Sequence, residues 1–168
     1  MRIASAAAPP FHKNGYLVSC EATRDAVLID PGDEVEALLD AARTDRLTVK
    51  AILLTHAHLD HVTGVGRAKA ALGGVPVWLH RADKFLYDAT VEQGRMFGIE
   101  VDQPPPVDEF YPRGARQAFG EYVVDVCPAG QEQPLVTEFF LAGGPELAGL
   151  RPYKGDLHVR TFRSDGER

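Results

Sequence analysis

The sequence predicts an α/β fold, in which a sheet is layered with crossover helices, and two observations support this prediction. Short apolar runs bounded by turn residues alternate with segments whose apolar residues recur every three to four positions. Their order over the first half of the chain is strand, helix, strand, helix, strand, which is typical of crossover connections. The 168 residues are 45% hydrophobic and 25% charged, an ordinary globular composition. We therefore expect residues 1–168 to form a single domain.

The individual elements follow from turn residues and from apolar spacing. Residues 16–20 and 26–29 are predicted strands, and the Asp-Pro-Gly turn at 30–32 ends the second one. Apolar residues at helical spacing from Val35 to Ala42 predict a helix with Asp33 as its N-cap. The remaining predicted elements are strands at 51–55 and 75–80, helices at 62–72 and 81–98, and strands at 122–126, 135–141 and 150–159.

Composition also excludes several classes of protein. The formal net charge is -6 and no run of lysine and arginine occurs, so we expect no nucleic-acid partner. No stretch approaches the ~18 apolar residues of a membrane-spanning helix, and the apolar N-terminus is too short for a signal sequence. Cys20 and Cys127 form no CxxC motif and are interpreted as reduced core thiols. These features predict a soluble cytoplasmic protein with no membrane partner.

The stretch from Thr55 to His61 is the most informative part of the chain. It holds three of the six histidines, at 56, 58 and 61, together with Asp60. Imidazole and carboxylate groups are good ligands for zinc, iron and manganese, and a solvated loop has no other reason to gather them. If the chain stays extended after the strand, His56 and His58 point to the same side and can reach one ion. Asp60 and His61, at the turn into the next helix, can serve a second ion beside it.

The pattern His56-x-His58-x-Asp60-His61 after an apolar strand resembles the signature of the metallo-β-lactamase fold superfamily. With the segments at 14–18 and 27–32, it looks most similar to the glyoxalase II-like branch. The resemblance implies a four-layer αββα sandwich with a metal site at one edge. It implies one or two divalent ions, zinc first and iron or manganese as alternatives.

The resemblance also assigns roles to residues. It places His56 and His58 on the first metal and Asp60 and His61 on the second, with Asp60 also acting as the catalytic residue that holds the bridging water. Asp30 matches a position where a carboxylate orients a ligating histidine, or it serves only as the turn-former of Asp-Pro-Gly.

Two departures from the family pattern occur in the second half of the chain. Gln131 stands where the family has a third histidine ligand, and glutamine is a poor zinc ligand. Asp156, in Lys-Gly-Asp at 154–156, is the candidate bridging ligand, although an alignment on the Gly-Gly pair at 143–144 would leave no carboxylate. The second half of the sandwich is also expected to be shortened, and a second copy of the chain, in a homodimer, would cover the edge that this leaves.

These observations leave three functions open. The first is a metal-dependent hydrolase that cleaves a thioester or related acyl compound with hydroxide activated by the metal, so that the partner is a small-molecule acyl or thiol substrate. The second is a mononuclear iron dioxygenase acting on a persulfide, with His56, His58 and Asp156 as a facial triad. The third is a metal-impaired, non-catalytic or truncated family member, for which Gln131 is the main argument.

Overall fold

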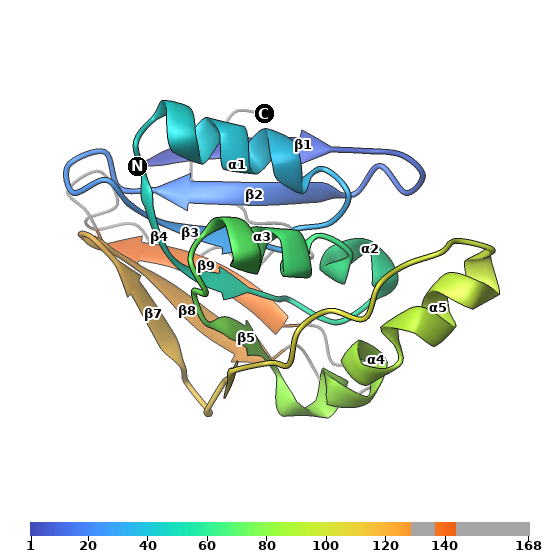
Figure 1. The fold of residues 1–168 in the computed structure, drawn as a ribbon. Helices are drawn as coiled ribbons and strands as arrows, with labels where there is room; N and C mark the ends of the chain where they lie inside the picture. The colour runs from blue at the N-terminus through green and yellow to red at the C-terminus, as the bar shows by residue number, and fades with distance from the viewer. Residues whose placement is uncertain (129–136, 144–168) are drawn as a thin grey trace, which may run out of the picture.

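A computed structural model describes residues 1–128 and 137–143 of the chain and places two β-sheets against each other (Figure 1). The larger sheet contains β1 (Arg2–Ala7), β2 (Asn14–Ser19), β3 (Asp25–Ile29), β4 (Thr48–Leu53), β5 (Val77–Leu79) and β6 (Glu109–Phe110). The smaller sheet contains β7 (Arg116–Phe119), β8 (Tyr122–Pro128) and β9 (Thr137–Gly143). The helical elements are α1 (Val35–Thr44), α2 (Leu59–Val62), α3 (Val65–Ala71), the 3₁₀ turn η1 (Arg81–Asp83), α4 (Lys84–Asp88) and α5 (Thr90–Phe97).

The larger sheet has the topology that the sequence predicts. Its strands are adjacent in chain order, with β1, β2 and β3 antiparallel and β3 to β6 parallel. Each parallel connection passes through helical structure, namely α1, then α2 and α3, then η1, α4 and α5. The ladder between β3 and β4 has one irregularity, because Ala26 pairs with Val49 while Val27 pairs with Ala51. Lys50 is therefore an extra residue in β4, a β-bulge.

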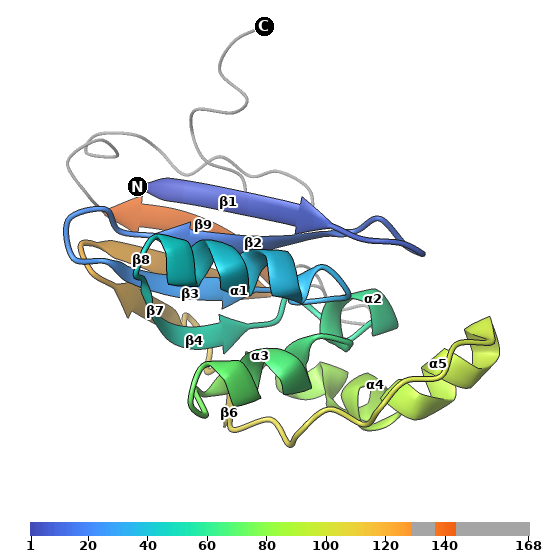
Figure 2. The same ribbon diagram turned by 45° about the horizontal axis from the view of Figure 1, so that its top comes forward.

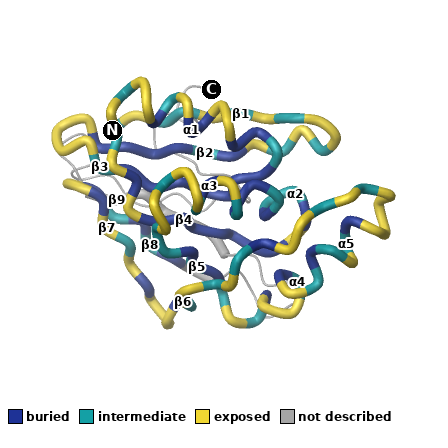
Figure 3. The backbone as a smooth tube through the Cα atoms, in the orientation of Figure 1, coloured by how far each residue is buried: buried dark blue, intermediate teal, exposed yellow. Residues whose placement is uncertain are grey.

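The central strands are buried on both faces, which explains their nearly continuous apolar sequences. In β3, Ala26 and Leu28 pack into the core beneath the helices, whereas Val27 and Ile29 pack into a second core with the smaller sheet. Figure 3 shows this buried interior as mostly dark tubes through β2, β3 and the second half of β4. Each fully buried Val, Leu or Ile contributes about 1.5–3 kcal/mol of transfer free energy. The two packed cores therefore hold together the helix layer, the larger sheet and the smaller sheet.

The predicted αββα sandwich is confirmed, and the described residues supply three of its layers. Helices α1 and α3 cover one face of the larger sheet, and the smaller sheet lies on the other face (Figures 1 and 2). The strand predicted at 135–141 is observed two residues later as β9. Gln131, Asp156 and the strand predicted at 150–159 lie outside the described residues. Among the helices that the structure describes, none is long and apolar enough to cross a membrane.

Two local predictions are wrong. The helix expected at 62–72 is two helices, because the chain turns at Gly64, where a Cβ atom would lie 2.2 Å from the carbonyl oxygen of Gly32. The N-cap of α1 is Glu34 rather than Asp33, and it makes no side-chain capping hydrogen bond. The Glu34 carboxylate instead accepts from the Gly32 N–H at 2.9 Å and from the ammonium of Lys13 at 3.1 Å. It therefore ties the Asp-Pro-Gly turn to the loop after β1.

Candidate metal centre

The histidine loop follows β4 and leads into α2, at the carboxyl end of a central parallel strand. The chain is still extended at His58, which has φ −67° and ψ 153° and is the N-cap of α2. Asp60 and His61 then lie in the single turn of that helix. The predicted change from extended to helical backbone within the loop is thus confirmed, and it directs side chains from both conformations to one place.

The imidazole ring of His56 contacts the rings of both His58 and His61. The ring centroids of His56 and His58 are 4.6 Å apart, and those of His56 and His61 are 3.9 Å apart. Asp60 is beside them, with its Oδ2 atom 3.6 Å from Nε2 of His61. His56 is buried, whereas the side chain of Asp60 is 27% exposed. The four side chains of the sequence motif therefore converge at the edge of the sheet.

Asp30 and Thr55 contact two of these rings at their Nδ1 atoms. The buried carboxylate of Asp30 accepts the backbone N–H of Thr55 at 2.8 Å and its hydroxyl at 2.6 Å, and it lies 3.0 Å from Nδ1 of His61. The Thr55 hydroxyl also lies 3.0 Å from Nδ1 of His56. Both rings are thus held through Nδ1, which leaves Nε2 available for another partner. Asp30 thus contacts a histidine of the motif and also forms the turn, with a left-handed φ of 47°.

Sequence reasoning did not single out Thr55, Lys13 or Glu34 as supporting residues. Thr55 is adjacent to the motif, but its role depends on Asp30, which precedes it by 25 residues. Lys13 donates to the carbonyl oxygen of Asp30 as well as to Glu34, and its side chain is only 11% exposed. Contacts between residues so far apart in the chain leave no local sequence signal.

The electrostatics favour a neutral His56 and a charged Asp30. Burial first, and the neighbouring His61 second, lower the pKa of His56 to about 4, although Asp30 acts to raise it. Burial also lowers the pKa of His58. Burial would raise the pKa of Asp30, but His61, Lys13 and Thr55 together outweigh it and lower that pKa to about 2. Neutral imidazoles beside ionised carboxylates are the protonation states that a metal site requires.

The donor set therefore fits a divalent cation in its chemistry. Three imidazoles and a carboxylate suit zinc, iron or manganese, and the Nδ1 contacts of His56 and His61 are those expected of oriented ligands. Within the described residues, no three His, Cys, Asp or Glu side chains enclose a metal position as they stand. In the described residues, the candidate ligands lie side by side but do not surround a metal position.

Comparison with known proteins places the chain in a family. The model of the metallo-beta-lactamase superfamily matches residues 8–145. The chain belongs to this superfamily. The match includes the Asp-Pro-Gly turn and the whole histidine motif, and the fold described above is the one that this superfamily has.

Relatives of this superfamily member include hydroxyacylglutathione hydrolases, which are glyoxalase II enzymes. The chain is 39% identical over 90 residues to hydroxyacylglutathione hydrolase GloC of Haemophilus influenzae, covering 53% of this chain and 40% of that protein. Among solved structures, it is similar to TTHA1623 in a di-iron-bound form, with 37% identity, a TM-score of 0.68, and coverage of 81% of this chain and 65% of that one. It is also similar to the BLEG-1 B3 metallo-beta-lactamase, with 26% identity, a TM-score of 0.71, and coverage of 83% and 66%. The chain thus spans about two fifths of that hydrolase.

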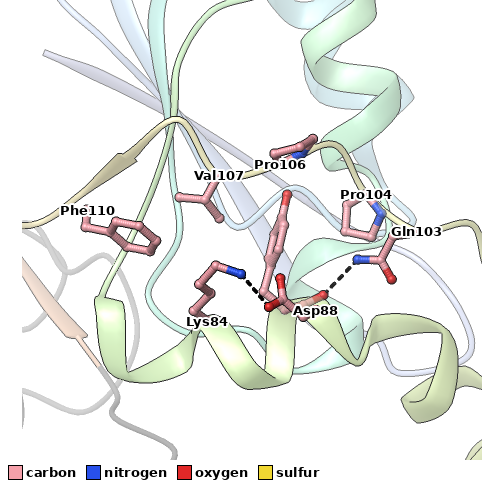
Figure 4. Close-up of a pocket in the computed structure, with 8 residues that line it drawn as sticks. Lys84, Asp88, Gln103, Pro104, Pro106, Val107 and Phe110 are labelled. Atoms are coloured by element: carbon pink, nitrogen blue, oxygen red, sulfur yellow. Dashed lines mark hydrogen bonds and ion pairs between the residues drawn. The ribbon is translucent and has the colours of Figure 1, made fainter.

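A separate pocket of about 520 Å³ lies against α4 and the proline-rich connector that follows α5 (Figure 4). It is lined by Lys84, Tyr87, Asp88, Gln103, Pro104, Pro106, Val107 and Phe110. The lysine and aspartate pair with each other across one turn of α4. None of the residues that line this pocket belongs to the histidine motif.

Proposed function

We propose that this member of the superfamily is a metal-dependent hydrolase that cleaves a thioester or a related small acyl substrate. The observation that carries the proposal is the convergence of His56, His58 and His61 with Asp60 at the sheet edge. The identity to hydroxyacylglutathione hydrolase GloC supports the choice of an acyl-thiol substrate. We propose the same four side chains as metal ligands, with Asp156 as a further ligand from outside the described residues.

The chain's own residues have distinct roles in this proposal. The metal would supply Lewis acidity, which polarises an acyl carbonyl and provides hydroxide at neutral pH. Asp30 and Thr55 hold His61 and His56 through Nδ1, so that both rings keep one orientation and one tautomer. Asp60, whose side chain is 27% exposed, orients the attacking water and accepts its proton at a carboxylate oxygen.

The proposal extends to the metal and the compartment. Zinc is the first candidate, because the histidines and carboxylates of the motif suit it. Iron is the second, because TTHA1623 was solved in a di-iron-bound form. Cys20 is a free, buried thiol, which is consistent with a reducing cytoplasm.

The test measures metal content and hydrolysis in the same samples. Protein purified without chelators is expected to contain at least about one zinc or iron per two chains. Addition of an S-hydroxyacylglutathione should release free glutathione, detected with a thiol reagent. His58→Ala should lose both metal and thiol release. His12→Asn is the matched control, because His12 is exposed, lies outside the cluster, and has a left-handed φ of 54° that asparagine tolerates.

Other outcomes decide between the alternatives. Metal uptake without thiol release, but with oxygen consumption when a persulfide is added to the iron-loaded protein, would favour the dioxygenase. A wild-type chain that takes up no metal would refute the proposal. If Gln131→His then restores both metal and thioesterase activity, the natural chain is the metal-impaired form of a hydrolase.

A further inference from the structure

We infer that Gln93 is a positioning residue for His58, and that through Gln93 the α4–α5 segment holds the histidine loop in its geometry. The inference rests on the proposed function, because it concerns a side chain that we propose as a metal ligand. It adds a residue that lies outside the motif and is far from it in sequence.

All three hydrogen-bonding groups of the Gln93 amide are used. Its Oε1 accepts the backbone N–H of Leu59 at 3.1 Å. Its Nε2 donates to the carbonyl oxygen of Ala57 at 3.0 Å and to that of Leu86 at 2.8 Å. A primary amide has two N–H donors and a carbonyl oxygen, so both donors and the oxygen are engaged, and these three bonds fix the orientation of the amide.

The partners of this amide are the two peptide groups on either side of His58. The carbonyl of Ala57 belongs to the peptide that precedes His58, and the N–H of Leu59 belongs to the peptide that follows it. These two peptide planes set φ and ψ of His58 and therefore the direction of its side chain. A single side chain thus fixes the backbone from which the proposed ligand projects.

In the described part of the chain, Gln93 is the side chain that caps α2 at this end. The N-cap of α2, His58, makes no capping hydrogen bond, and the first N–H groups of a helix have no partner within the helix. The Gln93 carbonyl satisfies the first of them and so fixes where α2 begins. Because Asp60 and His61 lie in this one-turn helix, its starting point also determines where they point.

The segment that carries Gln93 is itself tied to α4. The third hydrogen bond, to Leu86, joins α5 to α4, and the Thr90 hydroxyl donates to the carbonyl oxygen of Tyr87 at 2.7 Å. The Tyr87 hydroxyl in turn donates to the carbonyl oxygen of Pro105 at 2.7 Å. The histidine loop is therefore attached to a braced pair of helices rather than to a free loop.

The chain offers a matched control in Gln103. Its Nε2 donates to the carbonyl oxygen of Tyr87 at 3.0 Å, inside the pocket of Figure 4. Gln103 is the same residue type as Gln93 and also donates a hydrogen bond to α4, but none of its described contacts involves residues 56–61. Gln103→Leu should cost stability without changing the site.

The experiment compares Gln93→Leu with Gln103→Leu in the full chain. Zinc affinity, measured by competition with a chromogenic chelator, should fall about 10- to 100-fold in Gln93→Leu, as for other residues that orient a metal ligand, and stay at the wild-type value in Gln103→Leu. Cobalt-loaded Gln93→Leu should show altered visible absorption. If Gln93→Leu does not fold, Gln93→Glu replaces it, because glutamate keeps the acceptor for Leu59 but repels the two carbonyl oxygens.

A metal-free readout separates this inference from the proposed function. Hydrogen exchange of the Leu59 amide should be about tenfold faster in Gln93→Leu, corresponding to the loss of one hydrogen bond, and unchanged in Gln103→Leu. If wild type takes up no metal, the proposed function is refuted, and this exchange rate alone decides the present inference. Unchanged zinc affinity in a metal-binding chain, or an unchanged Leu59 exchange rate, would overturn it.

Discussion

Replacing Gly32 with alanine should destabilise the protein and disturb the metal centre together. A Cβ atom at this position would lie 2.2 Å from the backbone carbonyl oxygen of Asp60 and 2.9 Å from Oε2 of Glu34. The first contact is with backbone, so α2 must move away from the Asp-Pro-Gly turn. Overpacking of this kind costs about 1–3 kcal/mol. For a protein of this size each kcal/mol lowers the melting temperature by about 2–4 °C, so we expect a loss of about 2–12 °C.

Thermal unfolding of metal-free Gly32→Ala, followed by circular dichroism, measures this cost, and a zinc titration measures the effect on the site. Gly66→Ala is the control, because its Cβ atom would meet only Pro105 Cδ at an ordinary 3.5 Å. Gly66 lies within α3, where alanine is favoured over glycine by up to about 1 kcal/mol, so this variant should melt at or above the wild-type temperature. A Gly32→Ala protein with wild-type melting temperature and zinc affinity would refute the reasoning.

Three further predictions follow from described contacts. Thr55→Val removes a buried hydrogen bond to the ionised Asp30 and should cost about 1.5–3 kcal/mol by urea unfolding, whereas Thr63→Val should cost nothing, because the described residues give its buried hydroxyl no partner. Burial acts to raise the pKa of Asp108, but Lys69 and a backbone N–H outweigh it and lower that pKa, so this carboxylate stabilises the fold above its ordinary pKa of ~3.9. That contribution is lost as the pH falls through the lower folded-state pKa, so Asp108→Asn should unfold with a weaker pH dependence in acid; an unchanged acid profile would contradict this. Zinc at 100 times its dissociation constant should raise the free energy of unfolding by about 2.7 kcal/mol and the melting temperature by about 5–10 °C. A chelator should reverse this rise, and the absence of any shift would count against metal binding.

The fold could be predicted largely because its information is local. Strands β3 and β4 are continuous apolar runs, and α1 repeats its apolar residues at helical spacing, so each element is evident within its own few residues. The break between α2 and α3 could not be predicted in this way. It arises because Gly64 packs against the carbonyl oxygen of Gly32, a contact between residues far apart in the chain.

The candidate site also has a part that local sequence predicts and a part that depends on contacts between distant residues. The motif from His56 to His61 is contiguous, so its residue types alone indicated a metal site. Its supports are remote, and Gln93 follows Ala57 by 36 residues on a helix of mixed polarity. A glutamine in such a helix predicts a solvent-facing position, and only the folded chain brings its amide to the peptides around His58.

The bulge at Lys50 separates the start of β4 from the part of the strand that sets the geometry of this centre. Because β3 ends in the Asp30 turn and β4 ends before Thr55, the pairing register of the two strands decides whether carboxylate and hydroxyl meet. Side chains alternate between the two faces of a strand, so a shift of one residue would turn the hydroxyl toward the opposite layer. Lys50 is the extra residue of the bulge, so its deletion would leave this register unchanged. Deletion of a residue between Ala51 and Leu53 would instead separate carboxylate from hydroxyl while every histidine remained.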